Sequence, residues 1–460
     1  MANIKYSIEQ ALYKNLIFRT YYSFNRKTIW NYIDKLSYNC NLSRKQATDN
    51  QEMLFRKQIE YCYNNIPFYK KRFDDAGFHI SDNWSYAEFA EKVPVLEKYE
   101  IEDALARLIP ESKGQGLVKR QTSGSTGTPL IVFKDNLAAS FIDAAMHRNF
   151  LWYNIKIGDR RAHFWGGGGS RKQYLRYIFR DFLTNWRRFN CFELSKSSVL
   201  KFHSILERFR PKYLYGYAKC IYEYVCYAQE LGLSLCHIPS VVVITGEKIY
   251  ADQKNIIRSF FHAPVAEEYG CTECGIIAFE CPQGGMHIMS DMLFVETVRE
   301  QLPTKPGVAG SVVLTELRGN FFPLIRYRIG DTAILTESSC TCNLPFPLIE
   351  EIQGREDDYI ICPDGSKIDA YCIEYCIQQI PDKLGKVSNV KGTQTLQSEI
   401  DIMVAGEFVD WAAWKKDFLE KIKNYLPGIK VNLQLMDGIS RNLSGKMQFF
   451  ESTLGDKYDF

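Results

Sequence analysis

The stretch Gln121-Thr122-Ser123-Gly124-Ser125-Thr126-Gly127-Thr128-Pro129 is rich in glycine and hydroxyl side chains, and the apolar run Leu130-Ile131-Val132-Phe133 follows it. Glycines allow the backbone to turn tightly and bring its N–H groups close to a ligand. Successive N–H groups in such a turn form an anion site, to which Ser and Thr hydroxyls add donors. No Gly-Lys-Ser/Thr follows at the Walker spacing. Two interpretations therefore stand, a polyphosphate-binding loop of another kind or an ordinary surface loop.

Composition describes an ordinary globular chain. It has 460 residues, of which 46% are hydrophobic and 24% charged, and a formal net charge of +3. This length suits two or three domains, and a charge so near balance does not indicate a nucleic-acid partner. No apolar run approaches the ~20 residues that cross a bilayer, and the N-terminus lacks a signal-peptide pattern. We expect a cytoplasmic protein without a transmembrane segment, whose cysteines are reduced.

Apolar spacing along the chain indicates helices first and an α/β region afterwards. Residues 1 to about 115 are expected to be mostly helical, with a helix through Ser43–Tyr63 that ends before Pro67. A further helix is expected over 138–151. The run Val241-Val242-Val243-Ile244 is typical of a strand buried on both faces. It leads into Thr245-Gly246-Glu247, a position where loops of α/β sheets contact ligands.

The segment 171–190 combines basic and aromatic side chains. Its basic residues are Arg171, Lys172, Arg176, Arg180, Arg187 and Arg188, among Tyr174, Tyr177, Phe179, Phe182 and Trp186. One interpretation is a basic amphipathic helix that touches an anionic membrane or a ligand phosphate. The interpretation that we favour is a solvated helix face with the aromatic stripe turned to the core.

Four later stretches carry groups that suit a nucleotide: Glu268-Tyr269-Gly270-Cys271-Thr272-Glu273, Tyr327-Arg328-Ile329-Gly330-Asp331, Gly354-Arg355-Glu356-Asp357-Asp358 and Asn442-Leu443-Ser444-Gly445-Lys446. An adenine ring can stack on Tyr269. Glu273 offers the oxygen ligand that Mg²⁺ prefers beside substrate phosphates, and Asp331 can accept bonds from two ribose hydroxyls. Each stretch alone is a common surface turn, whereas their order and spacing together are specific.

In that order and spacing the sequence resembles the adenylate-forming superfamily of acyl- and aryl-CoA ligases, over nearly the whole chain. Within the superfamily it resembles the phenylacetate-CoA ligase branch with its capsule-biosynthesis, CapK-like relatives. The segments Ile66-Pro67-Phe68-Tyr69 and Val93-Pro94-Val95-Leu96-Glu97-Lys98 also look like that branch. The resemblance implies an α/β fold in two domains. A large N-terminal domain with mixed sheets would span 1–353, and a small mobile C-terminal α+β domain would span 354–460.

The resemblance also implies a role for each matching residue. The phosphate loop would be Ser123, Gly124, Ser125, Thr126 and Gly127. Adenine would meet Gly246, Glu247 and Tyr269, while Thr272 would face the α-phosphate and Glu273 would hold Mg²⁺. Asp331 would bind the ribose. Arg355 would lie near the nucleotide, Asp357 would mark the hinge, and Lys446 would reach the carboxylate and the α-phosphate.

The implied activity is ATP-dependent conversion of a small carboxylic acid to an acyl-adenylate, followed by transfer to a thiol, with coenzyme A as the first choice. Two anions must meet in the first step, so a metal and a lysine have to neutralise the charge that develops. One alternative is an enzyme that loads a carrier protein or an amine in surface-polysaccharide or natural-product assembly. Another is a catalytically silent scaffold of the same fold. The sequence leaves the acid and the oligomeric state open, a homodimer included.

A separate group of cysteines and one histidine suggests a structural zinc site. Cys281-x5-His287 and Cys340-x-Cys342 flank a strand-rich segment, 292–335, that could bring the two halves together. Three thiolates and one imidazole are a standard closed zinc set, without an open position for water. Chance proximity is the alternative in a chain with 14 cysteines, and Cys274 could replace one ligand. Cys271 and Cys274 are expected to pack as small residues.

Overall fold

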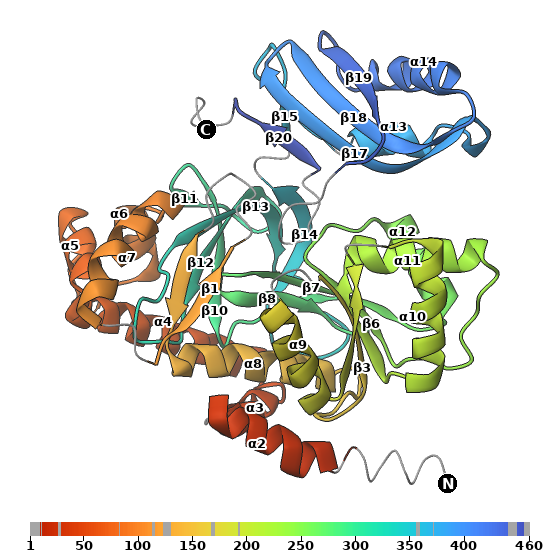
Figure 1. The fold of residues 1–460 in the computed structure, drawn as a ribbon. Helices are drawn as coiled ribbons and strands as arrows, with labels where there is room; N and C mark the ends of the chain where they lie inside the picture. The colour runs from red at the N-terminus through yellow and green to blue at the C-terminus, as the bar shows by residue number, and fades with distance from the viewer. Residues whose placement is uncertain are drawn as a thin grey trace. The chain divides into compact units, whose positions relative to one another are not determined.

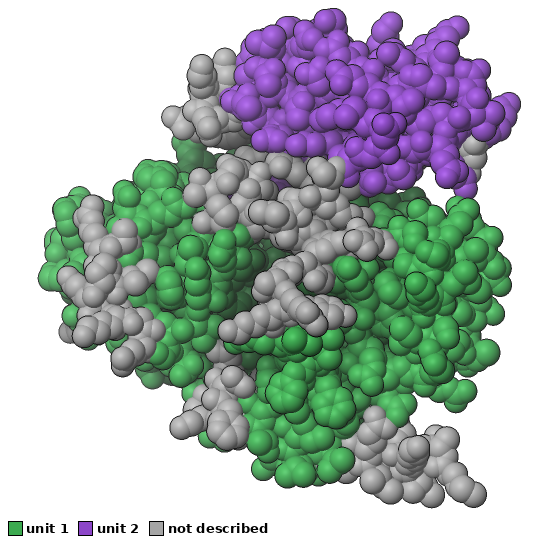
Figure 2. Space-filling view, in the orientation of Figure 1, with its two compact units in different colours: residues 1–329, 333–352 green, residues 330–332, 353–460 purple. Residues whose placement is uncertain are grey.

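The computed structural model describes residues 10, 12–25, 29–81, 83–112, 116–122, 130–166, 171–191, 194–355, 359–370, 372–439 and 449–454. The chain divides into two units, which Figure 2 shows in different colours. The first comprises residues 1–329 and 333–352, and the second 330–332 and 353–460. Each unit is described by itself.

Helices dominate the first hundred residues, as expected: η1 (Tyr13–Ile17), α2 (Phe18–Asn25), α3 (Ile29–Asn39), α4 (Arg44–Asn65), α5 (Pro67–Asp75), α6 (Tyr86–Lys92) and α7 (Lys98–Ser112). A capping box starts α4. The Ser43 side chain accepts from the Gln46 backbone at 3.2 Å, and the Gln46 side chain accepts from the Ser43 backbone at 2.9 Å. These bonds satisfy two of the amide donors that a helix start leaves open. The end of α4 before Pro67 is confirmed.

A twelve-stranded sheet forms the centre of the first unit, in the order β11-β10-β12-β13-β14-β9-β8-β7-β6-β5-β3-β4. Its first five strands along the chain are β3 (Arg161–Trp165), β4 (Trp186–Asn190), β5 (Tyr213–Tyr217), β6 (Val242–Thr245) and β7 (Val265–Cys271). These strands are parallel. The helices between them are α9 (Arg171–Leu183), α10 (Lys196–Phe209), α11 (Ala218–Glu230) and α12 (Ala251–Phe261). The expected α/β region is therefore present.

The remaining strands complete the sheet: β8 (Gly275–Glu280), β9 (Met286–Ile288), β10 (Leu293–Arg299), β11 (Leu302–Pro303), β12 (Ala309–Glu316), β13 (Tyr327–Thr336) and β14 (Leu348–Arg355). β7 pairs with β8, β8 with β9, β9 with β14 and β10 with β12, in every case antiparallel. The alternation of strands and helices thus stops after β7. The two edges of the sheet are the two-residue β11 and β4.

The parallel strands separate two cores. Leu214, Val242 and Ile244 face the core that contains buried side chains of α10, α11 and α12, and these helices gather on one side of the sheet in Figure 1. Tyr215 and Val243 face the larger core, which also contains side chains of α8 (Asn136–Leu151). This alternation follows from the two-residue period of a strand. The strand expected over 241–244 and the helix expected over 138–151 are confirmed.

A fully buried arginine ties α6 to the sheet. The Arg326 guanidinium pairs with Glu296 at 3.0 Å and donates to the Ala90 carbonyl at 2.7 Å and the Gln301 carbonyl at 2.9 Å. A buried charge is tolerated when it is paired and its remaining donors are bonded. This arrangement fixes the N-terminal helices against the antiparallel half of the sheet.

The second unit has its own sheet and core. The strands β17 (Gly385–Leu396), β18 (Glu399–Phe408), β19 (Lys430–Met436) and β20 (Phe450–Ser452) lie in the order β19-β18-β17-β20. β15 (Tyr359–Ile361) pairs with β16 (Lys367–Asp369), and the helices are α13 (Cys372–Gln378), η3 (Asp382–Leu384) and α14 (Trp411–Ile422). Trp414, Phe418 and Phe450 are buried in one core with the strands. The unit thus combines helices and strands, as expected for an α+β domain.

The expectation for residues 171–190 is wrong in two respects. The helix ends at Leu183, and the edge strand β4 follows. Phe179 and Phe182 are exposed, whereas the aromatic stripe was expected to face the core. Among the described residues, no helix is long and apolar enough to cross a membrane.

Candidate active site

The glycine-rich loop is framed by a hairpin. β1 (Val118–Gln121) and β2 (Ile131–Lys134) pair antiparallel, with Gln121 opposite Ile131. Next to this pair, the Thr122 amide donates to the Leu130 carbonyl at 2.9 Å, and the Leu130 amide donates to the Thr122 hydroxyl at 2.8 Å. The ends of the loop are thereby fixed. Ser123, Gly124, Ser125, Thr126 and Gly127 lie outside the described residues.

The expected adenine contacts come from two neighbouring strands. Thr245 at the end of β6 stands opposite Glu268 of β7, and the Thr245 hydroxyl donates to the Glu268 carbonyl at 3.0 Å. Gly246 follows with a φ of +81°, which glycine adopts at little cost. Glu247 accepts from the Lys219 amide at 3.1 Å. Gly246, Glu247 and the half-buried Tyr269 therefore belong to adjacent carboxyl ends of the parallel sheet.

The turn between β7 and β8 carries Thr272 and Glu273. Thr272 is exposed, and its carbonyl accepts from Arg120 of β1 at 3.4 Å, which links the turn to the loop hairpin. Glu273 is buried and accepts from the Tyr327 hydroxyl at 2.9 Å. Burial and the Glu273 carboxylate raise the pKa of Tyr327. Tyr327 thus remains a protonated donor that orients the carboxylate.

Asp331 and Arg355 meet within the second unit. Arg355 lies 3.8 Å from the Asp331 carboxylate, and a Cβ on Gly330 would stand 3.3 Å from the Arg355 guanidinium. Asp357 and Lys446 lie outside the described residues. Four positions after Lys446, Phe450 is fully buried and begins β20, which pairs with β17. The chain is therefore anchored shortly after the lysine.

A buried polar cluster lies beneath these strand ends, on the face of the sheet toward the larger core. The Tyr215 hydroxyl donates to Glu268 at 2.6 Å, and Arg161 stacks over the Tyr215 ring at 3.7 Å. His163 stands opposite Tyr215 on β3 and is 7% exposed. Neither ring nitrogen of His163 finds a hydrogen-bond partner within the described part of the chain. Buried polar atoms usually have a partner, so this cluster is suited to receive a polar ligand group.

Burial sets the charge states in this cluster. It holds the pKa of His163 well below the usual range, and the positive charge of Arg161 acts in the same direction. His163 is therefore a neutral imidazole with one donor and one acceptor. Burial also raises the pKa of Glu268, against the bond from Tyr215.

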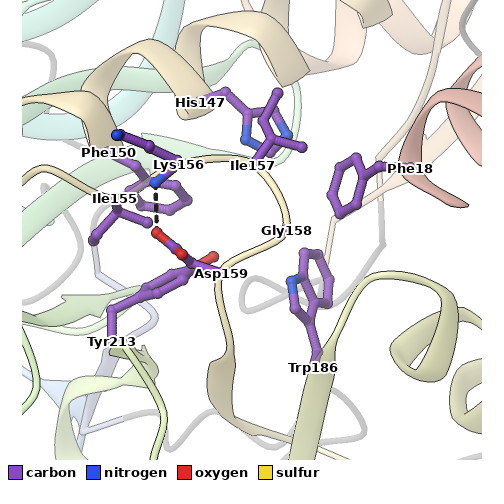
Figure 3. A pocket seen from close by; sticks show the side chains of 10 residues that line it. All are labelled: Phe18, His147, Phe150, Ile155, Lys156, Ile157, Gly158, Asp159, Trp186 and Tyr213. Atoms are coloured by element: carbon purple, nitrogen blue, oxygen red, sulfur yellow. Dashed lines mark hydrogen bonds between the residues drawn. The ribbon is translucent and has the colours of Figure 1, made fainter. Parts of the chain in front are cut away.

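A small pocket lies at the opposite ends of the strands (Figure 3). It is lined by Phe18, His147, Phe150, Ile155, Lys156, Ile157, Gly158, Asp159, Trp186 and Tyr213. The Asp159 carboxylate already accepts from the Lys156 amide at 2.7 Å, drawn as a dashed line in Figure 3, and from Gln10 at 2.5 Å. The Asp159 carboxylate therefore already has hydrogen-bond donors within the chain. The loops that are predicted to bind the nucleotide follow the other ends of the strands. The active site is therefore expected at the carboxyl ends, where the predicted nucleotide-binding residues lie.

The expected zinc residues come together. One ligand atom from each of Cys281, His287, Cys340 and Cys342 lies within 4.8 Å of the others. Their approach follows from the pairing of His287 on β9 with Leu348 on β14. The His287 Nε2 atom is 3.0 Å from the Cys342 sulfur, while Nδ1 is 3.1 Å from the Phe346 carbonyl. A donor at Nδ1 leaves Nε2 as the metal ligand.

Glycine is required beside this cluster. A Cβ on Gly285 would stand 2.7 Å from the Cys340 sulfur. The four groups fit the donor set of a structural zinc ion and fill its tetrahedral shell. Cys274 is buried, and its amide donates to the Cys271 sulfur at 3.3 Å, so it lies in the β7–β8 turn and not in the cluster.

Sequence reasoning missed Arg161, His163 and Tyr327. The signal for the first two was polar residues at every second position of Arg161-Ala162-His163-Phe164-Trp165, which puts both on one face of a strand. Tyr327 gave no signal, because its role depends on a hydrogen bond to Glu273, which lies in a turn 54 residues away from it in sequence.

Comparison with known proteins agrees with this arrangement. No protein-family model matches the chain. A phenylacetate-coenzyme A ligase of Thermus thermophilus is 23% identical over 345 residues, which are 70% of this chain and 73% of the relative. Protein CapK of Staphylococcus aureus is 20% identical over 85% of this chain and 90% of its own length. An indoleacetate–lysine synthetase of Pseudomonas savastanoi is 35% identical over 146 residues, 30% of this chain and 33% of that protein.

A solved structure shares the fold over most of the chain. The 2-hydroxyisobutyryl-CoA ligase, in its postadenylation state in complex with 2-HIB-AMP, superposes with a TM-score of 0.69 at 18% identity and covers 90% of both chains. The chain therefore has the fold of an adenylate-forming CoA ligase and resembles the superfamily of acyl- and aryl-CoA ligases in sequence. Within this superfamily its likeness is to the phenylacetate-CoA ligase-like branch, as the motifs of the sequence indicated.

Proposed function

We propose that this chain uses ATP to convert a carboxylic acid to an acyl-adenylate and transfers the acyl group to coenzyme A. The observation that carries the proposal is the β7–β8 turn. There a buried Glu273 is oriented by Tyr327, and Thr272 is bonded to the hairpin that frames the glycine-rich loop. Two oxygen-bearing groups next to backbone amides suit a metal-bound polyphosphate.

The residues then take the following parts. The substrate carboxylate forms a bond to the α-phosphorus as the bond to pyrophosphate breaks. The thiolate of coenzyme A then bonds to the acyl carbon and AMP leaves. Ser123 to Gly127 bind the phosphates, Thr272 the α-phosphate, and Gly246, Glu247 and Tyr269 the adenine. Asp331 holds the ribose beside Arg355.

Two groups supply positive charge in this proposal. Glu273 would hold Mg²⁺, which neutralises the phosphates when bound. Lys446 neutralises the charge that develops between the carboxylate and the α-phosphate, because preorganised charge lowers the barrier most where negative groups approach. The thiol step requires the lysine to withdraw, and Asp357 is the proposed hinge. The zinc ion would be structural, since four protein ligands leave no position for substrate.

One relative supports a different acceptor for the acyl group. The indoleacetate–lysine synthetase carries a name that describes joining an acid to an amine. The alternative function is therefore transfer of the acyl group to an amine or a carrier protein, and the capsule-biosynthesis role remains a proposal beside it.

Acid-dependent ATP–pyrophosphate exchange tests adenylation directly, across aryl, fatty, hydroxy and amino acids. We expect exchange with one class and a CoA thioester when coenzyme A is added. Adenylate formation without a thioester would move the amine or carrier protein to first place. Absence of both exchange and ATP binding would favour the silent scaffold.

The matched variants are Lys446→Ala and Lys423→Ala. Lys423 is an exposed lysine of the same unit that follows α14. We expect Lys446→Ala to lower exchange by about 10²–10³-fold, with an unchanged circular dichroism spectrum and with Lys423→Ala at the wild-type rate. An unchanged rate in Lys446→Ala would assign the lysine no part in adenylation.

A further inference from the structure

The helix α9 exposes an apolar stripe. Leu175, Ile178, Phe179 and Phe182 are exposed by 58%, 47%, 64% and 55%. Their spacing of three, one and three residues places them on one face of the helix. Helices of globular proteins normally turn such a face to the core, and none of these four side chains belongs to either core beside the parallel strands.

Polar contacts hold α9 on the protein. Asp181 is buried and pairs with Arg188 of β4 at 2.9 Å and with Arg180 at 3.1 Å. Arg188 also lies 4.9 Å from the Tyr177 ring centre, and the Thr184 hydroxyl donates to the Arg180 carbonyl at 2.8 Å. The inner side of the helix is therefore charged and the outer side apolar.

Basic residues accompany the stripe in the sequence. The segment 171–188 contains six arginines and lysines but a single acidic residue, Asp181. The Asp181 carboxylate is already paired with Arg180 and Arg188, whereas Arg176 and Arg187 are exposed. The outer surface of this segment thus combines apolar and positive groups.

We propose that α9 docks this protein onto an anionic membrane surface. The four apolar side chains enter the boundary between headgroups and acyl chains, and the arginines bind the anionic headgroups, which is the arrangement of interfacial amphipathic helices. A second copy of the chain is a poorer occupant. A symmetric dimer places the same patch against itself, so the arginines of the two copies would repel each other.

The proposal is independent of the catalytic function and can be tested with the full chain and vesicles. We compare sedimentation with vesicles of phosphatidylglycerol and phosphatidylcholine and with vesicles of phosphatidylcholine alone. We expect partition into the anionic vesicles, weakened by high salt because the attraction is partly electrostatic. Phe179→Ser/Phe182→Ser should reduce partition by at least about tenfold, because the two rings supply much of the inserted apolar surface.

The matched control is Leu200→Ser on α10, where Leu200 is likewise exposed on a helix, by 49%. It should partition as the wild type does. A second variant, Arg176→Glu, keeps the apolar stripe and should weaken binding to anionic vesicles only. It replaces the double variant in the test if circular dichroism shows that the double variant is unfolded. No partition of the wild type, or equal partition of wild type and double variant, would overturn the proposal. If the wild type is a dimer that does not bind vesicles and the double variant is a monomer, the stripe belongs to a protein interface instead.

Discussion

Two buried nitrogens of His163 lack hydrogen-bond partners among the described residues, although the cluster around them is polar. An orphaned buried donor or acceptor costs about 1–3 kcal/mol. A buried group without a partner calls for an explanation, such as an ordered water or a ligand. We expect the ligand to be the acid, with His163 in the wall that recognises it.

His163→Phe tests this placement because it keeps a ring of similar size and removes both orphaned atoms. We expect the free energy of unfolding to rise by about 1 kcal/mol, while the KM for the acid rises and that for ATP stays the same. The control is His203→Phe, since His203 bonds the Tyr224 hydroxyl at 3.0 Å and its replacement should destabilise the protein. A variant that is more stable with an unchanged KM for the acid would remove His163 from the acid site.

The roles of single residues could be predicted from the sequence where one short motif contains the residues concerned. Glu273 and Thr272 were identified from their own turn, and the four zinc candidates from short spacings. The partners that tune them were not visible. Tyr327, which orients Glu273, and Phe346, which orients His287, are supplied by strand register and loop conformation, and these emerge only when the sheet forms.

The segments that carry Cys281, His287, Cys340 and Cys342 form an element whose metal content can be measured. Purified protein should contain about one zinc per chain, because the four donors match a closed tetrahedral site. Cys342→Ser should lose the zinc and lower the melting temperature by about 5 °C or more, since metal binding contributes to folding.

The control for this experiment is Cys236→Ser, an exposed cysteine outside the cluster. It should retain the zinc and the melting temperature of the wild type. Zinc-free protein with undiminished thermal stability would show that the cluster is a chance approach of four side chains.

Helices and strands were predictable where the local pattern agrees with the final packing. The capping box of α4, the proline at the start of α5 and the Val242–Thr245 strand are examples. The prediction for residues 171–190 was wrong because the 3.6-residue pattern of α9 continues into β4. In addition, an amphipathic pattern alone does not determine which side of a helix faces the core. Here a buried Asp181, held by Arg188, decides that the charged side faces inward.

At the scale of the whole molecule, buried histidines make stability depend on pH. Burial lowers the pKa of His147 from 6.5 to about 3, and that of His163 well below 6.5. Below pH 6.5 the unfolded chain binds protons at these positions that the folded protein does not. Stability contributed by the neutral histidines is therefore complete above pH 6.5 and is lost as the pH falls.

Urea unfolding between about pH 4.5 and 8 measures this effect. We expect wild-type stability to fall more steeply below pH 6.5 than that of His147→Phe/His163→Phe, by about 1.4 kcal/mol per pH unit for each histidine. The two curves should run parallel above pH 7. Parallel curves throughout would mean that the histidines are protonated in the folded protein.

The resemblance to adenylate-forming ligases was predictable at this scale from the order of dispersed motifs, and the relatives and the shared fold confirm that likeness. The roles of the two domains and of Lys446 stay predictions, because they depend on residues beyond those that the structure describes.

The long central sheet also bears on how the protein avoids self-association. An open sheet has unpaired backbone groups at its two ends, and such ends recruit strands from other molecules. Here one end is the two-residue β11, which contains Pro303, and the other is β4, which carries Arg187 and Arg188 in succession. A strand so short, with a proline in it, offers few amides to an incoming chain. On β4, the exposed Arg187 repels the Arg187 of a second copy of the same strand, whereas Arg188 is paired with Asp181. Twelve strands can therefore lie side by side in one molecule without extending into a fibril.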